Sequence, residues 1–380
     1  MLLEYGLKNF LSFKDGVSVS FRLDANCPVN VSQGREFATV MCVKGANGSG
    51  KTQLLKGLAF VADFVTRSFS LEPDDEIKVD SFFGDPGVSE FFVEFGVGSH
   101  EYRYELGLTS KGVQTEVLYR TASRRTKLFE RIGDAIKAPG KALSTLNEIK
   151  LRQNASTISI AHQYQIKELE PVYDFFHSIT GNVGYAGMRQ RNFLEMGMVS
   201  GMFAARPDIL EFAKDFIRDS DIGISDVQIS ETESPDGKKL YSPVFLHLVD
   251  GKGAPVSVVT ESSGTKQLFR NLFLYKLVLN IGGVLVLDEF DIYLHPQILP
   301  KLVDLFMDPE KNPKNAQLLF TTHSLEIIDI SGRYRTYLVN KEDNVSYAFR
   351  LDEIPGDLLR NDRSIIPAYR EGRIGGVPRL

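Results

Sequence analysis

The chain has 380 residues, of which 43 % are hydrophobic and 24 % are charged. This is the ordinary globular mix, which excludes wholesale disorder and a fibrous repeat, and the length predicts two or three domains or one large domain with an insertion. Lysine and arginine number 44 against 49 aspartate and glutamate residues, a net charge of −5. That balance argues against a protein coated in positive charge for non-specific binding of nucleic acid, although it leaves room for a local basic patch.

Cysteine usage and hydrophobic patterning predict a cytoplasmic protein without a membrane partner. Cys27 and Cys42 are the only cysteines, which excludes a zinc site built on several thiolates and gives no disulfide framework. The longest uncharged apolar stretch, residues 277–287, is well short of the roughly 20 residues that span a bilayer. Glu4 and Lys8 lie where a signal peptide would need an apolar core, so secretion is not expected.

The first third of the chain, residues 1–120, is predicted to be mainly strands and hairpins. Alternating apolar residues over 17–21 share one face. The runs 101–106 and 113–119 are separated by a polar turn that ends in glycine, which is typical of a hairpin. One long helix, 51–64, interrupts this β region, because its leucines and alanines recur at helical spacing.

From residue 121 to 240 the pattern changes to helical runs, such as 166–179 and 207–218, with few strand signals and no sustained heptads. We expect an inserted, mainly helical lobe here. The remaining residues, 241–380, would join 1–120 in one discontinuous domain. Its predicted elements are a helix at 263–280, a strand at 284–287, a helix at 297–307 and a strand at 317–321. Strands that alternate with helices imply a parallel or mixed sheet covered on both faces.

A glycine-rich loop carries the strongest local signal. It follows the apolar strand 38–43, precedes the helix at 51–64 and has the form of a Walker A loop. Glycines let consecutive backbone N–H groups converge on phosphate oxygens, and the start of the helix adds positive dipole. Lys51 would reach the β- and γ-phosphates, and Thr52 would offer its hydroxyl to Mg²⁺. The alternative, a glycine-rich turn with an incidental lysine, is disfavoured by this context. The predicted ATP-binding residues of the loop are Gly45, Asn47, Gly48, Ser49, Gly50, Lys51 and Thr52.

Two carboxylates, Asp288 and Glu289, follow the predicted strand at 284–287. A buried strand would deliver them to its carboxyl edge, beside the phosphates. There Asp288 would hold Mg²⁺ through water, and Glu289 would polarise the attacking water as general base. An apolar run followed by Asp-Glu is by itself more often a plain strand end. With a Walker A loop in the same chain, the catalytic interpretation is favoured.

Two further segments indicate which kind of nucleotide enzyme this is. Residues 261–267 open the helix that precedes the carboxylates, with small residues that let backbone approach a phosphate. Residues 318–324 form a strand that ends in His323, which could sense a γ-phosphate. As isolated segments they would be a helix N-cap and a strand-end histidine. Their order and spacing favour the nucleotide role.

In this order the motifs resemble the ABC-type ATPase heads, the group that includes SMC and RecF proteins. Within it, the resemblance is greatest to the OLD-like and RloA-like ATPases of bacterial phage-defence systems. It implies an α/β P-loop fold, an ABC-type head with an N-terminal antiparallel β subdomain and an inserted lobe. It says little about 121–240. The segments that carry it are Leu7–Phe13, Gly45–Thr52, Glu261–Gln267, Val284–Pro296, Thr321–Ser324 and Tyr369–Pro378.

The resemblance also implies an ATP- and Mg²⁺-dependent site shared by two chains. Ser263 and Gly264 of one head would meet the γ-phosphate bound to Lys51 of the other, although this signature departs from the Leu-Ser-Gly-Gly-Gln form of transporters. Glu289 would be the catalytic glutamate and His323 the switch histidine.

A metal-contacting glutamine is likewise implied between the Walker A loop and the lobe. Gln163 is the candidate in this sequence, and a plain surface glutamine on a helix is an equally good interpretation of it.

Nucleotide that contacts both heads only in a closed dimer stabilises closure, so the output is motion or gating of a partner. The first hypothesis is a slow, regulatory ATPase of anti-phage defence that gates a separately encoded effector, a nuclease or toxin, because the chain leaves no room for an appended nuclease domain after residue 380. The second is a RecF- or SMC-like DNA clamp, because a cluster of basic residues could follow a phosphate backbone. A solvated loop is the competing interpretation of that cluster. A transporter's ATPase subunit fits poorly, since the signature differs. The basic cluster behind the second hypothesis is Arg120, Arg124, Arg125, Lys127 and Arg131.

Overall fold

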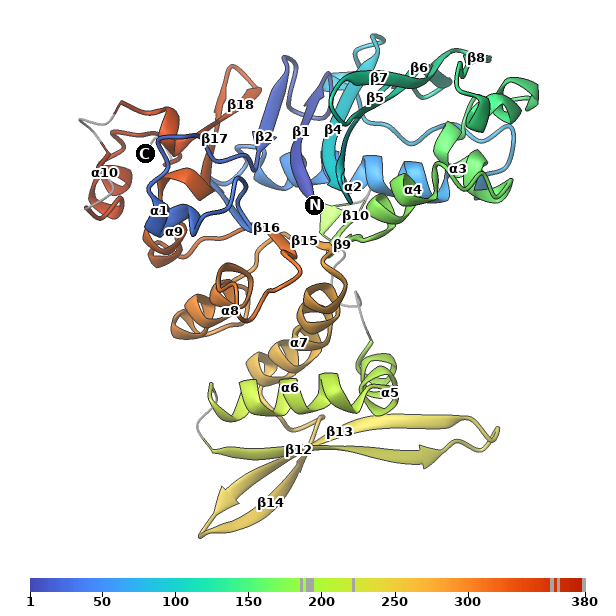
Figure 1. The fold of residues 1–380 in the computed structure, drawn as a ribbon. Helices are drawn as coiled ribbons and strands as arrows, with labels where there is room; N and C mark the ends of the chain where they lie inside the picture. Colours follow the sequence, from blue (N-terminus) through green and yellow to red (C-terminus); the bar gives the residue numbers. More distant parts are fainter. Residues whose placement is uncertain (185–186, 189–194, 221–222, 356–358, 361–362, 378–380) are drawn as a thin grey trace. The chain divides into compact units, whose positions relative to one another are not determined.

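The computed structural model describes residues 1–184, 187–188, 195–220, 223–355, 359–360 and 363–377, and the chain forms two compact units (Figure 1). The first unit comprises residues 1–188, 282–290 and 315–380. The second comprises residues 189–281 and 291–314.

The first unit contains an antiparallel sheet with the strand order β2-β1-β4-β5-β6-β7-β8. In β4, Phe91, Val93 and Phe95 are buried and alternate with more exposed residues, as expected for a sheet with one covered face. The predicted N-terminal antiparallel subdomain is confirmed, and β5 and β6 form the expected hairpin. The strands are β1 (Leu2–Lys8), β2 (Val17–Ser20), β4 (Ser89–Val97), β5 (His100–Thr109), β6 (Gly112–Thr121), β7 (Arg125–Ile132) and β8 (Ala135–Lys137).

A second sheet of the same unit has the order β18-β17-β3-β16-β15-β9. All neighbouring pairs are parallel except β17 with the edge strand β18. The central strands are buried on both faces and read as continuous apolar runs, as parallel strands do. The strands are β3 (Val40–Gly45), β9 (Ile179–Gly181), β15 (Val284–Leu287), β16 (Gln317–Thr321), β17 (Thr336–Glu342) and β18 (Val345–Arg350).

Helix α2 (Lys51–Arg67) contacts both sheets and joins their cores. The Tyr5 hydroxyl of β1 donates to the Leu54 carbonyl at 3.2 Å. Gly57 lets Leu7 approach, because a Cβ at that position would lie 2.3 Å from the leucine side chain. The amino end of α2 is thereby fixed between strands of both sheets. The short helices α3 (Thr157–Gln163) and α4 (Glu170–His177) pack against α2 as well.

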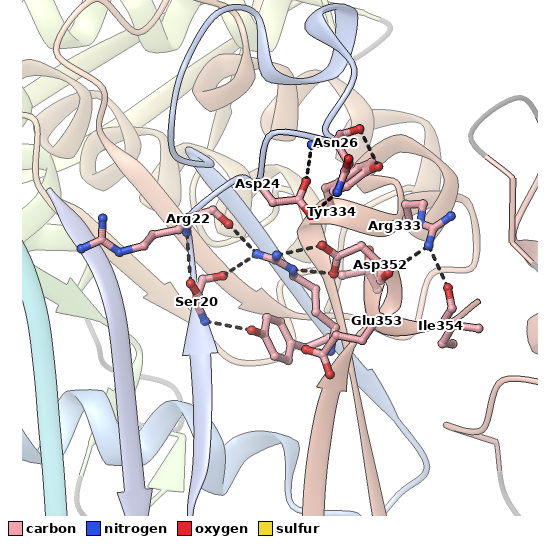
Figure 2. A network of polar contacts seen from close by, with 12 residues as sticks. Ser20, Arg22, Asp24, Asn26, Arg333, Tyr334, Asp352, Glu353 and Ile354 are labelled. Carbon is pink, nitrogen blue, oxygen red and sulfur yellow. Dashed lines mark hydrogen bonds and ion pairs between the residues drawn. The ribbon is translucent and has the colours of Figure 1, made fainter. Parts of the chain in front are cut away.

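A polar network ties the ends of β2 and β18 together within this unit (Figure 2). The Arg350 guanidinium donates to the carbonyls of Ser20 and Arg22 at 3.1 and 2.7 Å and forms a bidentate pair with Asp352. The Ser20 N–H donates to the Tyr337 hydroxyl at 2.8 Å. Burial raises the pKa of Tyr337 to about 12, so this phenol stays neutral at physiological pH.

Among its described residues, the second unit combines α-helices with the three-stranded antiparallel sheet β12-β13-β14, and the helices α5 and α6 contact this sheet. Phe269 of α7 lies 4.6 Å from Phe203 of α5 and 5.6 Å from Phe245 of β13, measured between ring centroids. All three rings are buried and form the centre of this core. The elements are α5 (Met196–Ala205), α6 (Pro207–Arg218), α7 (Ser263–Ile281), α8 (Leu299–Met307), β12 (Ile224–Glu233), β13 (Lys239–Val249) and β14 (Lys252–Ser257).

The division of the chain differs from the predicted head (1–120 and 241–380) and lobe (121–240). Residues 121–188 belong to the first unit, where β7 and β8 extend the antiparallel sheet, and residues 241–281 belong to the second. The sequence predicted few strands in 121–240, whereas β7, β8 and β12 lie there. The strand β7 lacks a clear apolar-in, polar-out alternation, because Arg131 is fully buried and Ile132 is exposed.

A buried ion pair explains why β7 stays with the first unit. Arg131 and Glu116 are fully buried, with 3.4 Å between the guanidinium and the carboxylate. Glu116 also accepts from the backbone N–H and the hydroxyl of Thr157, at the start of α3, and from the Tyr104 hydroxyl. The satisfied cluster joins β5, β6 and β7 to α3, because a buried charge must be paired.

Within the described part of the chain, none of the helices has the length and apolar character required to cross a membrane.

Candidate nucleotide site

The loop from Gly45 to Lys51 joins the carboxyl end of β3 to the start of α2. Gly50 has φ 113°, and a Cβ there would lie 2.7 Å from the Ser346 hydroxyl oxygen. A Cβ at Gly45 would lie 2.3 Å from the Val339 carbonyl oxygen. Both positions therefore require glycine, and the loop leaves its backbone free of side chains. Asn47 and Gly48 lie exposed at its crest.

The polar groups of this loop fit a bound phosphate chain. The Lys51 ammonium is buried and donates to the carbonyls of Gly45 and Ala46 at 2.9 and 3.1 Å. The Ser49 hydroxyl is buried and has no hydrogen-bond partner among the described residues. An unsatisfied buried hydroxyl is costly, and a ligand in the loop is one way to satisfy it. Lys51 is the cation that would bind the anionic ligand.

Asp288 contacts the start of α2 at the sheet edge where β3, β16 and β15 present their carboxyl ends. One of its carboxylate oxygens accepts from the Thr52 hydroxyl at 2.8 Å. The other accepts from the Thr321 hydroxyl at 2.6 Å, and the side chain is almost fully buried. The two predicted Mg²⁺ residues are thus in contact, and their hydroxyl and carboxylate oxygens are the donors that Mg²⁺ takes.

Glu289 is held in a left-handed backbone conformation, with φ 49°. A glutamate rarely adopts this conformation, so its surroundings must stabilise it. Its N–H donates to the Thr321 hydroxyl at 2.8 Å, and the Phe290 N–H donates to the Thr321 carbonyl at 2.9 Å. The end of β16 therefore fixes the turn that carries the predicted general base.

Thr321 and Asn182 are site residues that the sequence analysis did not assign. The Asn182 side-chain amide forms two hydrogen bonds with the backbone of Asp288: it accepts from the Asp288 N–H at 2.7 Å and donates to the Asp288 carbonyl at 2.8 Å. Asn182 follows β9, a strand of only three residues that pairs with β15. Such a short strand carries too little periodicity to be predicted, so the sequence offered no signal for Asn182. Thr321 lay at the end of a predicted strand, beside His323, and that position could have indicated it.

The N-terminal segment is also part of the site. The Ser12 backbone N–H donates to the Gln53 side chain of α2 at 3.1 Å. The hydroxyls of Ser12 and Ser346 lie 2.6 Å apart, and Ser346 donates to the Ser49 carbonyl at 2.6 Å. This chain of hydrogen bonds ties the loop after β1 and the hairpin of β17 and β18 to the phosphate loop.

His323 follows β16 by two residues, at the sheet edge that also carries Gly45 and Asp288. Its side chain is exposed. Ser263 and Gly264 lie in the second unit, at the first residues of α7, where the Ser262 hydroxyl accepts from the Thr265 N–H at 3.1 Å. Their predicted role in a neighbouring chain stays a prediction.

Gln163 is not at this site. It is exposed at the end of α3, beside His162, whose ring stacks on Tyr173 at 3.6 Å. The Tyr173 hydroxyl donates to the Thr66 carbonyl, which belongs to the last turn of α2. Thr52 belongs to the first turn, and a helix of 17 residues is about 25 Å long. The helical position of Gln163 could not reveal which end of α2 it would approach.

Comparison with solved structures gives the class of the fold. A structure titled as the SMC head bound to the C-winged helix domain of ScpA matches with a TM-score of 0.51 and 14 % identity, over 93 % of this chain and 99 % of that chain. The SMC head domain from Thermotoga maritima matches with a TM-score of 0.45 and 16 % identity, over 92 % and 98 % of the two chains. The fold is that of an SMC-head-like, ABC-type P-loop ATPase.

The family model described as "AAA domain, putative AbiEii toxin, Type IV TA system" matches residues 40–329, and the chain belongs to this family. No curated protein matches the sequence significantly. The protein is therefore an ATPase of the AAA and SMC-head type. The predicted OLD-like or RloA-like branch stays a prediction.

Replacing Thr321 with valine tests the newly assigned residue. The change keeps the shape and removes the hydroxyl that contacts both Asp288 and the Glu289 N–H, so we expect a loss of about 1–3 kcal/mol in the free energy of unfolding. The ATPase kcat should fall at least about tenfold, because the base loses its support. Thermal melting and steady-state ATPase assays measure the two effects. Thr39→Val, at a buried threonine before β3, is the matched control and should leave kcat unchanged.

Proposed function

We propose that the chain is a slow, Mg²⁺-dependent ATPase of bacterial anti-phage defence, which dimerises around ATP and gates a separately encoded effector in the cytoplasm. The observation that carries the ATPase part is the contact of Thr52, Asp288, Thr321 and Glu289 beside the phosphate loop. A general base, metal donors and a phosphate cradle meet there at one sheet edge. These are the parts that hydrolysis of a nucleoside triphosphate requires.

Each residue has a separate task in this mechanism. Lys51 and the loop N–H groups bind the phosphates, and Thr52 and Asp288 hold Mg²⁺. When bound, Mg²⁺ would neutralise negative charge on the phosphates. The Glu289 carboxylate orients a water molecule and accepts its proton, because its turn is fixed by Thr321. His323 contributes a polar contact at the same edge.

The effector part of the proposal is supported by two comparisons. The family description, with its putative AbiEii toxin of a type IV toxin–antitoxin system, supports a role of the chain in such a system. One structure of similar fold is an SMC head bound to a domain of a second protein, ScpA. A head of this fold can therefore bind a separate polypeptide, and we extend that capacity to an effector nuclease or toxin for this chain.

The basic cluster gives the DNA-clamp alternative less support than the sequence suggested. Arg131 is fully buried, and Arg120 pairs with Glu168 at 2.6 Å. Lys127 pairs with Glu130 at 2.8 Å. Arg125 lies near the Glu105 carboxylate and over the Tyr119 ring. The cluster is therefore largely neutralised and is a poor track for a phosphate backbone.

Complementation tests the shared site. Lys51→Ala and Ser263→Arg should each abolish ATPase activity, and Ser263 is exposed, so the arginine should not disturb folding. A mixture of the two variants should recover about a quarter of wild-type activity, because random pairing makes half of the dimers mixed and each then carries one intact site. The double variant mixed with either protein is the control. An inactive mixture would contradict the dimeric site.

The effector is tested by isolating the Glu289→Gln protein from its native host with and without ATP, followed by native mass spectrometry. We expect a stoichiometric protein partner in the ATP-bound state. A dimer that carries only DNA would instead support the clamp.

A further inference from the structure

The C-terminal segment folds back onto the nucleotide-binding sheet. Helix α10 (Ile366–Arg370) places Tyr369 in a buried position, and its hydroxyl donates to the Gly376 carbonyl at 2.8 Å. The Gly376 N–H in turn donates to the Asn340 side chain of β17 at 2.7 Å. Burial raises the pKa of the Tyr369 hydroxyl, which therefore keeps the proton it donates.

The paired glycines of this segment are required by its close packing. Gly375 and Gly376 have φ 78° and 76°, a backbone conformation that favours glycine. A Cβ at Gly376 would lie 3.0 Å from the Tyr369 ring and 3.1 Å from the Leu338 side chain. The turn therefore holds the ring of Tyr369 against β17.

The face of the Tyr369 ring is directed at a buried cation of β3. Lys44, directly before the phosphate loop, is almost fully buried, and its ammonium lies 5.6 Å from the centre of the ring. The same ammonium donates to the Ser324 carbonyl at 2.6 Å. Ser324 is the residue after His323, and its N–H donates to the Thr322 hydroxyl at 3.0 Å. Lys44 thus connects the C-terminal segment to the loop that carries the histidine.

A second link joins the same two parts. Helix α9 (Glu326–Ser331) begins just after that loop, and its Asp329 accepts from the Ser364 hydroxyl at 2.5 Å and from the Ile365 N–H at 2.6 Å. A small apolar core also joins Ile328 of α9 to Leu359 and Tyr369. Contacts linked to the C-terminal segment therefore hold the histidine loop on its carboxyl side, at Ser324 and in α9.

We propose that residues 364–377 form a latch that positions the His323 loop through Tyr369 and Lys44, so that these two residues are positioning residues for ATP hydrolysis. The inference rests on the proposed function in one respect only, the role of His323 in turnover. A buried ammonium needs hydrogen-bond partners in any case, so the inference depends on which partner Lys44 takes, the Ser324 carbonyl of the histidine loop. The geometry gives one continuous path from Gly376 to Ser324.

The test compares Lys44→Met and Tyr369→Leu, each in the wild-type and in the His323→Ala background. Both changes should lower kcat about tenfold in the wild-type background, because the loop loses its position. The affinity for a fluorescent ATP analogue should stay unchanged. Neither change should lower kcat further when His323 is already alanine, and Lys44→Met combined with Tyr369→Leu should cost no more than either alone. Tyr369→Phe, which keeps the ring over Lys44, should retain most of the wild-type kcat that Tyr369→Leu loses.

Equal losses in both His323 backgrounds, or additive losses in the Lys44 and Tyr369 pair, would overturn the latch. Leu359→Ala is the control for simple destabilisation, since it weakens the same small core without touching Lys44. Amide hydrogen exchange of residues 322–326 gives a readout independent of ATPase activity. Exchange should accelerate more in Lys44→Met and Tyr369→Leu than in Leu359→Ala, which removes part of the apolar link to α9 and leaves the bond from Lys44 to Ser324 in place. If the wild-type protein hydrolyses no ATP, the proposed function is wrong. The exchange measurement still tests whether residues 364–377 position the His323 loop.

Discussion

Replacing Lys51 with alanine should strongly weaken binding of ATP and abolish ATPase activity. Lys51 is the buried cation of the phosphate loop, and its ammonium now donates to two loop carbonyls, Gly45 and Ala46. Removing a buried, hydrogen-bonded charge from its anionic ligand costs about 2–5 kcal/mol in binding free energy. The dissociation constant for ATP should therefore rise by at least about thirtyfold.

Titration with a fluorescent ATP analogue and Mg²⁺ measures this effect. Lys56→Ala is the matched control, because Lys56 lies on the same helix and is partly exposed. It should leave the affinity unchanged. Retention of wild-type affinity by Lys51→Ala would show that the loop is a structural turn, and the function proposed for the chain would have to be abandoned.

Glu289→Gln should separate binding from turnover. Glutamine has nearly the same shape, and the backbone N–H of residue 289 can still donate to Thr321, so the turn should survive. The amide cannot accept a proton from water, and loss of a general base costs about a hundredfold to ten-thousandfold in kcat. ATP affinity should remain within about twofold of wild type, because the change removes an interaction made in the transition state.

Single-turnover kinetics with radiolabelled ATP distinguishes slow chemistry from slow product release in this variant. Analytical ultracentrifugation with ATP should show an accumulated dimer, since closure no longer ends in hydrolysis. Glu326→Gln, at an exposed carboxylate of α9, is the control and should turn over normally. Normal turnover in Glu289→Gln would remove Glu289 as the base and leave another group at this sheet edge to be found.

Much of the site could be predicted because its signals are local. The phosphate loop is a contiguous segment between a strand and a helix, and α2, β15 and β16 lie where the periodicity placed them. Asp288 and Glu289 follow a buried parallel strand, and such strands present their carboxyl ends at one edge. The contact of Thr52 with Asp288 follows from that rule, although the two residues are far apart in the sequence.

Partners that depend on long-range packing could not be predicted. Thr321 and Asn182 support Asp288 only because β16 and β9 flank β15 in the sheet. Gln163 was the candidate for the glutamine that the resemblance implies, yet it lies near the end of α2 that is remote from Thr52. The basic run in β6 and β7 was ambiguous until the structure supplied its partners, such as Glu168 and the buried Glu116.

The sequence by itself determined the phosphate loop, the acidic strand end and the class of the fold, because each depends on a few neighbouring residues and on the period of a single element. The tertiary structure alone decided which unit residues 121–188 join and which side chains orient the carboxylates. It also decided that Tyr369 lies over Lys44. Those outcomes depend on burial and on the pairing of charges between segments remote in the chain, which no local pattern encodes.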